Sequence, residues 1–276
     1  MLIAEFNGER IEATAATRGH QYRCPHCKGA VIFKRGRRVI WHFAHKPPTD
    51  CTWAAGETRG HLEAKALVHA AMSARGRQSQ VEYVVAVLPG DRRADVMAWS
   101  STGQPLAFEL QHTSIGLDEI EARSRCYARA GIAQIWIPFL SAAAWSQAEP
   151  RGAGQLFLAK YPARPFERWV HGLNGKDGMW MYAPWSKKFW HARLAGHQLW
   201  VEESTWFEAG GEERSAGGFY RWSKRYRELT LTGPYEIGNL DIAIAPRSAA
   251  TLDVYNWPAG LIARFVPVSP VPTGHR

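Results

Sequence analysis

The fold is decided by residues 93–111, RADVMAWSSTGQPLAFELQ. Its two ends read as short strands and a Ser-Ser-Thr-Gly turn separates them, which predicts a β-hairpin. Asp95 lies in the first strand, and Glu109 and Gln111 share one face of the second. In a hairpin, Asp95 and Glu109 can lie close together, and two close carboxylates repel unless a divalent cation lies between them. The stretch therefore predicts a site for Mg²⁺ or Mn²⁺.

The segments on either side of this hairpin extend it into an α/β unit. The predicted elements are a helix over 61–75, strands over 81–88, 93–99 and 106–111, a helix over 116–130 and a buried strand over 132–139. A turn at Pro89-Gly90-Asp91 closes the first strand, and Gly131 ends the second helix. The predicted order is helix, three strands, helix, strand.

One acidic residue of the first helix has two interpretations. Glu63 shares the i, i+3, i+4, i+7 stripe of a core face with Ala66, Leu67 and Ala70. A carboxylate on a core face is costly unless a cation or a hydrogen-bond donor meets it, which makes Glu63 a candidate for the metal site. Alternatively, Glu63 is an acid near a helix start, where it suits the helix dipole.

The strongest local signal lies within residues 1–58. Cys24-Pro25-His26-Cys27 is followed, fourteen residues later, by His42-Phe43-Ala44-His45 and then by Cys51. A Cys-x2-Cys pair places two thiolates in one tight turn, as a tetrahedral zinc site needs. A segment this short has little core, so bound zinc would supply the missing stability. The alternative is a cluster of reduced cysteines with incidental histidines.

Five residues compete for four zinc ligand places. We expect Cys24, Cys27, Cys51 and His45 to bind the ion, with His42 either replacing His45 or lying just outside the ligand shell. Strands predicted over 29–34 and 38–43, around a turn at Arg35-Gly36-Arg37, would return the chain to the cysteine pair. Such a site is closed, and therefore structural rather than catalytic.

The last third of the chain is rich in tryptophan, glycine and proline. Nine of the 13 tryptophans lie at or beyond residue 145, in short predicted strands cut by turns, so we expect a mostly β region. Four cations surround three aromatic residues between Tyr220 and Arg227, which is typical of nucleic-acid binding. The alternative is that the tryptophans fill a thin β core. These changes in composition predict three domains, over 1–58, 59–145 and 146–276.

The charge balance favours a polyanionic partner. The 276 residues include 34 Lys+Arg and 25 Asp+Glu, a formal net charge of +9, although many basic proteins bind no such partner. Charges within the first ten residues argue against a signal peptide, and the uncharged run 130–148 is interrupted by Pro138. We expect a soluble, cytoplasmic protein without membrane insertion.

Taken together, these motifs resemble the competence protein CoiA family over roughly the first half of the chain. The resemblance rests on Cys24-Pro-His-Cys27, His42-Phe-Ala-His45, Cys51, Glu63-Ala-Lys-Ala-Leu67, Arg93-Ala-Asp95-Val96, Phe108-Glu109-Leu110-Gln111-His-Thr-Ser114, Arg123-x3-Tyr127, Gly131 and Ile135-Trp136-Ile137. The central part is similar to the PD-(D/E)xK core of restriction-endonuclease-like nucleases, an αβββαβ unit, with Gln111 in place of the usual Lys.

The resemblance implies a DNA-processing nuclease that takes part in DNA uptake, transformation and recombination. Asp95 and Glu109 would bind Mg²⁺ or Mn²⁺, Glu63 would complete the site, and Gln111 would hold water or a phosphate oxygen. The expected partners are single-stranded or branched DNA and proteins of DNA uptake or recombination. Two alternatives remain open: a catalytically inactive DNA-binding scaffold that keeps the nuclease fold, and a nuclease directed at RNA. The candidate nucleic-acid contacts are Arg37, Arg38, Arg123, Arg221, Lys224 and Arg225.

Overall fold

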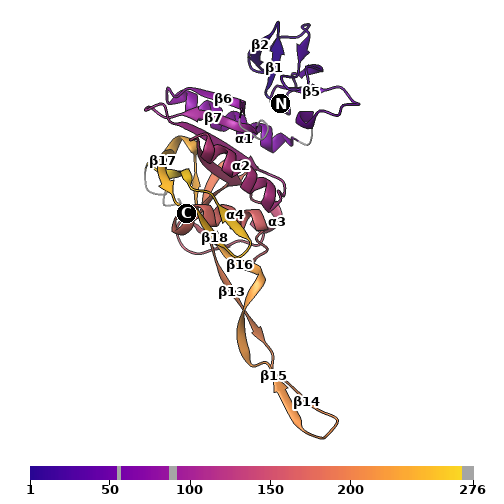
Figure 1. Ribbon diagram of the computed structural model, residues 1–276, viewed down its shortest axis with the longest axis vertical. Coiled ribbons are helices and arrows are strands. Elements are labelled where there is room, and N and C mark those ends of the chain that lie inside the picture. The colour runs from indigo at the N-terminus through magenta and orange to yellow at the C-terminus, as the bar shows by residue number, and fades with distance from the viewer. Residues whose placement is uncertain (55–56, 87–91, 269–276) are drawn as a thin grey trace.

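The computed structural model describes residues 1–54, 57–86 and 92–268. The molecule is elongated: N-terminal strands lie at one end, an α/β body lies in the middle, and a two-stranded ribbon projects from the other end (Figure 1). The fold is mixed α/β and consists mostly of strands. Within these described ranges no helix is both long and apolar enough to cross a membrane.

The N-terminal part forms a small antiparallel sheet with the strand order β2-β1-β3-β4-β5. Its strands are β1 (Ile3–Phe6), β2 (Glu9–Glu12), β3 (Tyr22–Arg23), β4 (Ala30–Lys34) and β5 (His42–His45), followed by the short 3₁₀ helix η1 (Thr52–Ala54). Its core is small and includes Tyr22, Val31 and Phe43. A sheet of this size buries little apolar surface, so its stability needs a further source.

The strand predicted over 38–43 is wrong through Trp41. β5 begins only at His42, where it pairs with Lys34 of β4. Val39 and Ile40 instead pack against the core of the central body. An apolar pair that reads as a strand is therefore used to attach the module to the body.

The predicted element order over residues 59–145 is confirmed. The elements are α1 (Arg59–Ala74), β6 (Ser79–Val85), β7 (Arg92–Trp99), β8 (Pro105–Gln111), α2 (Leu117–Arg129) and β9 (Ala133–Pro138). β6, β7 and β8 pair antiparallel, whereas β8 and β9 pair parallel because α2 carries the chain back across the sheet. The end of the strand predicted over 81–88 and the turn Pro89-Gly90-Asp91 lie outside the described residues.

Two strands from the end of the chain enlarge this central sheet. β17 (Leu240–Arg247) and β20 (Gly260–Pro267) pair antiparallel, and β20 runs parallel to β9, which gives the order β17-β20-β9-β8-β7-β6. The central sheet thus takes strands from both sides of residue 145. The division into three domains remains a prediction.

The buried face of α1 differs from the predicted stripe. Glu63, Ala66, Leu67 and Ala70 are half-buried or exposed, while the buried side chains are His61, Leu62, Ala64, Lys65, Val68 and Met72. The prediction of this buried face was wrong because a hydrophobicity pattern assigns lysine to the solvent-facing side of a helix. Lys65 is nevertheless fully buried, since its ammonium group pairs with Glu57 and lies 2.5 Å from Glu82.

Replacing Lys65 by Met is expected to lower the free energy of unfolding by about 3 kcal/mol, because it leaves Glu57 and Glu82 buried without their shared cation. Urea denaturation would measure this loss. Lys160→Met, at an exposed lysine outside this central sheet, is the matched control and should change stability by less than about 0.5 kcal/mol. Equal stabilities of the two variants would contradict the buried ion-pair assignment.

A second sheet has the order β10-β11-β16-β13-β12. Its strands are β10 (Glu149–Pro150), β11 (Gln155–Tyr161), β12 (Met179–Ala183), β13 (Lys188–Val201) and β16 (Phe219–Tyr235). The tip of the ribbon is the pair β14 (Ser204–Phe207) and β15 (Glu213–Ala216), and a small hairpin is formed by β18 (Ala250–Leu252) and β19 (Tyr255–Trp257). The helical segments are α3 (Ala142–Trp145), α4 (Pro165–Asn174), η2 (Gly175–Asp177) and η3 (Ile237–Asn239).

The tryptophans of this region divide between core and surface. Trp169, Trp180, Trp190 and Trp257 are buried. Trp200, Trp206 and Trp222 lie exposed on the projecting ribbon. Core filling thus accounts for the first group and leaves the second unexplained.

Candidate functional site

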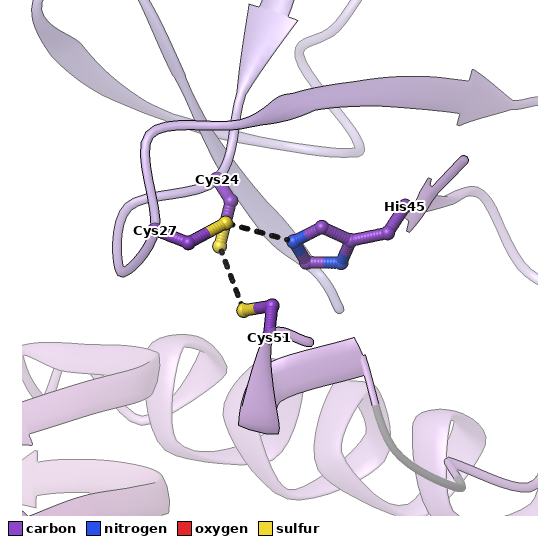
Figure 2. Close-up of side chains that lie close together, drawn as sticks. All are labelled: Cys24, Cys27, His45 and Cys51. Carbon is purple, nitrogen blue, oxygen red and sulfur yellow. Dashed lines mark hydrogen bonds between the residues drawn. The ribbon is translucent and has the colours of Figure 1, made fainter. Parts of the chain in front are cut away.

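Four predicted zinc ligands lie together in the N-terminal module. Ligand atoms of Cys24, Cys27, His45 and Cys51 all fall within 4.8 Å of one another, so the group could hold a metal ion. The Cys24 and Cys51 sulfurs are 3.9 Å apart, and Cys27 Sγ is 3.3 Å from His45 Nε2 (Figure 2). His45 at the end of β5 and Cys51 just before η1 approach the Cys-x2-Cys turn from other parts of the chain.

The turn that carries the cysteine pair is fixed by its backbone. Cys24 N–H donates to Gly29 O at 2.8 Å, and Lys28 N–H donates to Cys24 O at 2.9 Å. Burial raises the pKa of the Cys24 thiol to about 11. A bound metal would have to displace this proton, because the thiolate is the ligand.

The two other histidines near the cysteines have different surroundings. His42 Nδ1 lies 2.8 Å from Ile40 O, and His42 is not part of the four-residue cluster. His26 stacks on Trp53, with ring centroids 5.3 Å apart. Of the two alternatives left open by the sequence, the geometry therefore favours His45 over His42.

A second group of possible metal ligands lies in the central body. Glu57, His61 and Asp95 offer ligand atoms within 4.8 Å of one another, and they line a cleft of about 570 Å³. His61 lies between the two acids: its Nε2 is 3.1 Å from Asp95 Oδ2, and its Nδ1 is 3.8 Å from Glu57 Oε1. Neither nitrogen makes a well-aligned hydrogen bond within the described residues, and the His61 ring stacks on His112 at 4.5 Å.

Both acids of this group are ionised at neutral pH. Burial alone would raise the pKa of Glu57, but Lys65 and the amino group of Met1 lower it to about 2. Burial also acts to raise the pKa of Asp95, but His61 and a 2.8 Å hydrogen bond from Leu110 N–H hold it well below its usual range. The cleft therefore presents two carboxylates and a buried imidazole, a donor set that fits a divalent cation.

Glu109 lines the same cleft but is held by its own neighbours. The Tyr127 hydroxyl donates to one carboxylate oxygen, and Arg123 Nη1 lies 3.1 Å from the other. Burial raises the pKa of Glu109 to about 7, against the opposing effect of Arg123. Near neutral pH, Glu109 is therefore divided between its protonated and ionised forms.

The four predicted catalytic residues are not all brought together. Asp95, Glu109 and Gln111 line the cleft, and Gln111 Nε2 donates to Thr113 O at 2.8 Å. Glu63 does not line it. Its carboxylate pairs with Arg59 at 2.8 Å and with Lys187 at 3.7 Å instead.

The predicted nucleic-acid contacts are scattered over the molecule. Arg37 and Arg38 are exposed in the loop between β4 and β5, and Arg221, Lys224 and Arg225 are exposed on β16. Arg123 differs, because its guanidinium is engaged by Glu109 and, at 2.9 Å, by Glu119.

Four residues of the site and its surroundings were not predicted from the sequence: Glu57, His61, Lys65 and Glu82. A signal for the first three exists: they recur every fourth residue, the spacing that places side chains on one face of a helix. Glu82 carries no such signal. Its backbone has a φ of 52°, which non-glycine residues rarely adopt, and its carboxylate lies buried against Lys65.

Comparison with known protein families identifies two consecutive parts of the chain. Residues 5–54 match the N-terminal domain of competence protein CoiA, and residues 57–195 match the nuclease-like domain of competence protein CoiA. Among curated proteins, no match was found. The second family match alone spans just over half of the chain. The chain therefore belongs to the competence protein CoiA family, with the N-terminal domain followed by the nuclease-like domain.

Proposed function

We propose that this protein is a DNA nuclease that depends on a divalent metal ion and has a restriction-endonuclease-like PD-(D/E)xK core. The observation that supports this most is the convergence of Glu57, His61 and Asp95 in a cleft that Glu109 and Gln111 also line. Membership of the CoiA family favours a cytoplasmic role in DNA uptake and recombination, alongside other proteins of those processes.

We assign the ion to Glu57, His61 and Asp95. A divalent ion bound there would act as a Lewis acid on phosphate and lower the pKa of a bound water. Asp95 stays ionised and is oriented by Leu110 N–H. Both Glu109 oxygens are engaged by Arg123 and Tyr127, so we give Glu109 the role of proton acceptor, for which a pKa of about 7 is suited.

Gln111 has the role of an uncharged positioning group in this proposal. It lies two residues after Glu109 on β8, on the same face of the strand, and it lines the cleft. Its amide can donate a hydrogen bond to a phosphate oxygen, although it supplies no positive charge.

The imidazole in the donor set makes a prediction about the metal. Mg²⁺ prefers oxygen ligands, whereas Mn²⁺ accepts imidazole more readily, so cleavage of single-stranded, duplex or branched DNA is expected to be about tenfold faster in Mn²⁺. His61→Asn replaces the nitrogen donor by an oxygen and should lower this Mn²⁺/Mg²⁺ rate ratio severalfold. Rates in equal concentrations of each ion, against EDTA, provide the measurement.

The control for this experiment is a second histidine of α1. His69 lies two turns farther along α1, next to Ser79 Oγ and 3.3 Å from Glu12, and does not line the cleft, so His69→Asn should leave the ratio unchanged. An unchanged ratio in His61→Asn would contradict the assignment of His61 as a ligand.

A catalytically inactive DNA-binding scaffold is the competing proposal. Its support is that the chain already neutralises its own acids: Glu57 pairs with Lys65, and Glu109 pairs with Arg123. Binding of DNA without cleavage in Mn²⁺ and in Mg²⁺ would favour the scaffold.

We further propose that the cysteine cluster holds structural zinc. Tetrahedral zinc with Zn–S bonds of about 2.3 Å separates two sulfurs by about 3.8 Å, and the Cys24 and Cys51 sulfurs lie 3.9 Å apart. Three thiolates and one imidazole are a common zinc donor set, and they leave no open place for a substrate.

The N-terminal module also offers a surface for phosphate groups. A groove of about 800 Å³ is lined by five cations and by no carboxylate: Arg18, Arg23, Lys34, Arg35 and Lys46. With Arg37 and Arg38 nearby in the chain, this groove supports DNA as the partner of the module.

A further inference from the structure

The projecting ribbon is a surface that the proposed nuclease site does not use. Beyond the body, β13 and β16 pair only with each other, with Gln198 opposite Trp222, Trp200 opposite Tyr220 and Val201 opposite Phe219. Figure 1 shows this ribbon extending away from the body toward the β14–β15 tip. A two-stranded ribbon is marginally stable alone, so exposed side chains on it need an explanation.

The alternation of strand residues sorts the exposed aromatic side chains by face. Cross-strand partners share a face, as do residues two apart, so Trp200, Tyr220 and Trp222 lie on one face. They are 47%, 64% and 65% exposed. Phe219, which is 53% exposed, lies on the opposite face with Arg221. One face thus carries a row of three large rings.

All three rings contact neighbours on the ribbon. The rings of Trp200 and Tyr220 pack edge to face, with centroids 4.9 Å apart. The six-membered ring of Trp222 lies against Gly196, so closely that a Cβ at position 196 would fall 2.6 Å from its Cζ3. The row is therefore organised before any partner arrives, which lowers the entropy cost of binding.

Charge is divided along the ribbon. Residues 202–218 at the tip contain five carboxylates and one arginine, Arg214. Lys224 and Arg225 follow Trp222 on β16 and are exposed, whereas the exposed Arg221 lies on the opposite face. None of the three forms an ion pair within the described part of the chain. A polyanion is thus attracted to the aromatic stretch and repelled by the tip.

We propose that this aromatic row, with Lys224 and Arg225 beyond it on the same strand, binds single-stranded nucleic acid. Every base has a π-face, so unpaired bases stack on Trp and Tyr whatever their sequence, while the cations contact phosphates. Bases in a duplex are already stacked and paired and cannot use such a row. This inference rests on the proposed nuclease function and names the class of nucleic acid that the protein holds.

The test measures binding separately from cleavage. Fluorescence anisotropy of a labelled oligo-dT of about 30 nucleotides, in buffer with no added Mg²⁺ or Mn²⁺ and no chelator, would report affinity for the full-length protein and its variants. Trp200→Ala, Tyr220→Ala and Trp222→Ala are each expected to weaken binding roughly tenfold. Gly196→Ala, which displaces the Trp222 ring without removing it, should weaken binding in the same direction. A combined Lys224→Ala and Arg225→Ala variant should reduce the salt slope by about 1.4.

Matched controls decide which face is used. Phe219→Ala on the opposite face and Trp206→Ala in the acidic tip should bind as the parent does. The aromatic substitutions should scarcely change the binding of a duplex, and an RNA of matched sequence shows whether the sugar matters. Equal losses in Phe219→Ala, equal losses on duplex, or no loss in the three row variants would each overturn the inference. Cleavage by the same proteins in Mn²⁺ tests the nuclease function independently.

Discussion

Replacing Asp95 by Asn is expected to lower metal-dependent DNA cleavage by about 10³-fold, a loss of about 4 kcal/mol in transition-state stabilisation. The reason is that Asp95 is an ionised donor of the cleft, and Asn removes its charge while keeping its size. The Asn carbonyl can still accept the Leu110 hydrogen bond, so the fold should persist. Cleavage rates at saturating Mn²⁺, together with the thermal unfolding midpoint, measure the two effects.

Glu63→Gln is the informative companion to this variant. The sequence places Glu63 in the catalytic set, whereas its carboxylate contacts Arg59 and Lys187 outside the cleft. Glu63→Gln should therefore keep most of the activity, within about threefold of the parent. A loss as large as that of Asp95→Asn would contradict this geometry and restore the set predicted from the sequence. Absence of cleavage in the parent itself would favour the scaffold.

The predictable part of the candidate site is the part encoded locally. Asp95 and Glu109 lie in one hairpin, so strand alternation and a short turn were enough to bring both to one cleft. The cysteine cluster could be predicted equally well, because the Cys-x2-Cys spacing places two thiolates in one tight turn. In both cases few residues separate the groups that meet, and the pattern carries the chemistry.

The rest depends on contacts that no local pattern reports. Lys65 is buried only because Glu57 and Glu82 surround it, and without these partners a core lysine is implausible. The parallel pairing of β20 with β9 joins Ile262 to Gln134, far along the chain. Such long-range pairings depend on packing, so the enlarged central sheet could not be predicted from its own residues.

The ribbon illustrates a third kind of limit. The cluster from Tyr220 to Arg227 was recognised from composition, but composition could not separate a buried tryptophan from an exposed one. The structure adds the cross-strand partner Trp200, which shares one exposed face of the ribbon with Tyr220 and Trp222. That face exists only once the register is fixed.

Removing the metal from the cysteine cluster is expected to unfold the N-terminal module. Cys24→Ser should abolish zinc binding, since a serine hydroxyl is a poor zinc ligand and Cys24 is the buried member of the set. Structural zinc contributes roughly 10 kcal/mol of apparent binding free energy in small modules, far more than this core can replace. Elemental analysis, together with limited proteolysis between residues 1 and 54, would show the loss. Cys126→Ala, at a buried cysteine outside the cluster, should retain one zinc per chain.

Loss of this zinc should also slow cleavage, although no catalytic step uses it. Leu2 N–H donates to Glu82 at 2.9 Å, and the guanidinium of Arg93 lies over the Trp53 ring at 4.4 Å. The module therefore contacts and positions residues beside the cleft. Unfolding the module would free Glu82 and, through it, Lys65 and Glu57. We expect Cys24→Ser to cleave DNA at least tenfold more slowly than Cys126→Ala at the same Mn²⁺ concentration. A zinc-free Cys24→Ser protein that resists proteolysis and cleaves at the parental rate would show that the cluster neither stabilises the module nor supports the site.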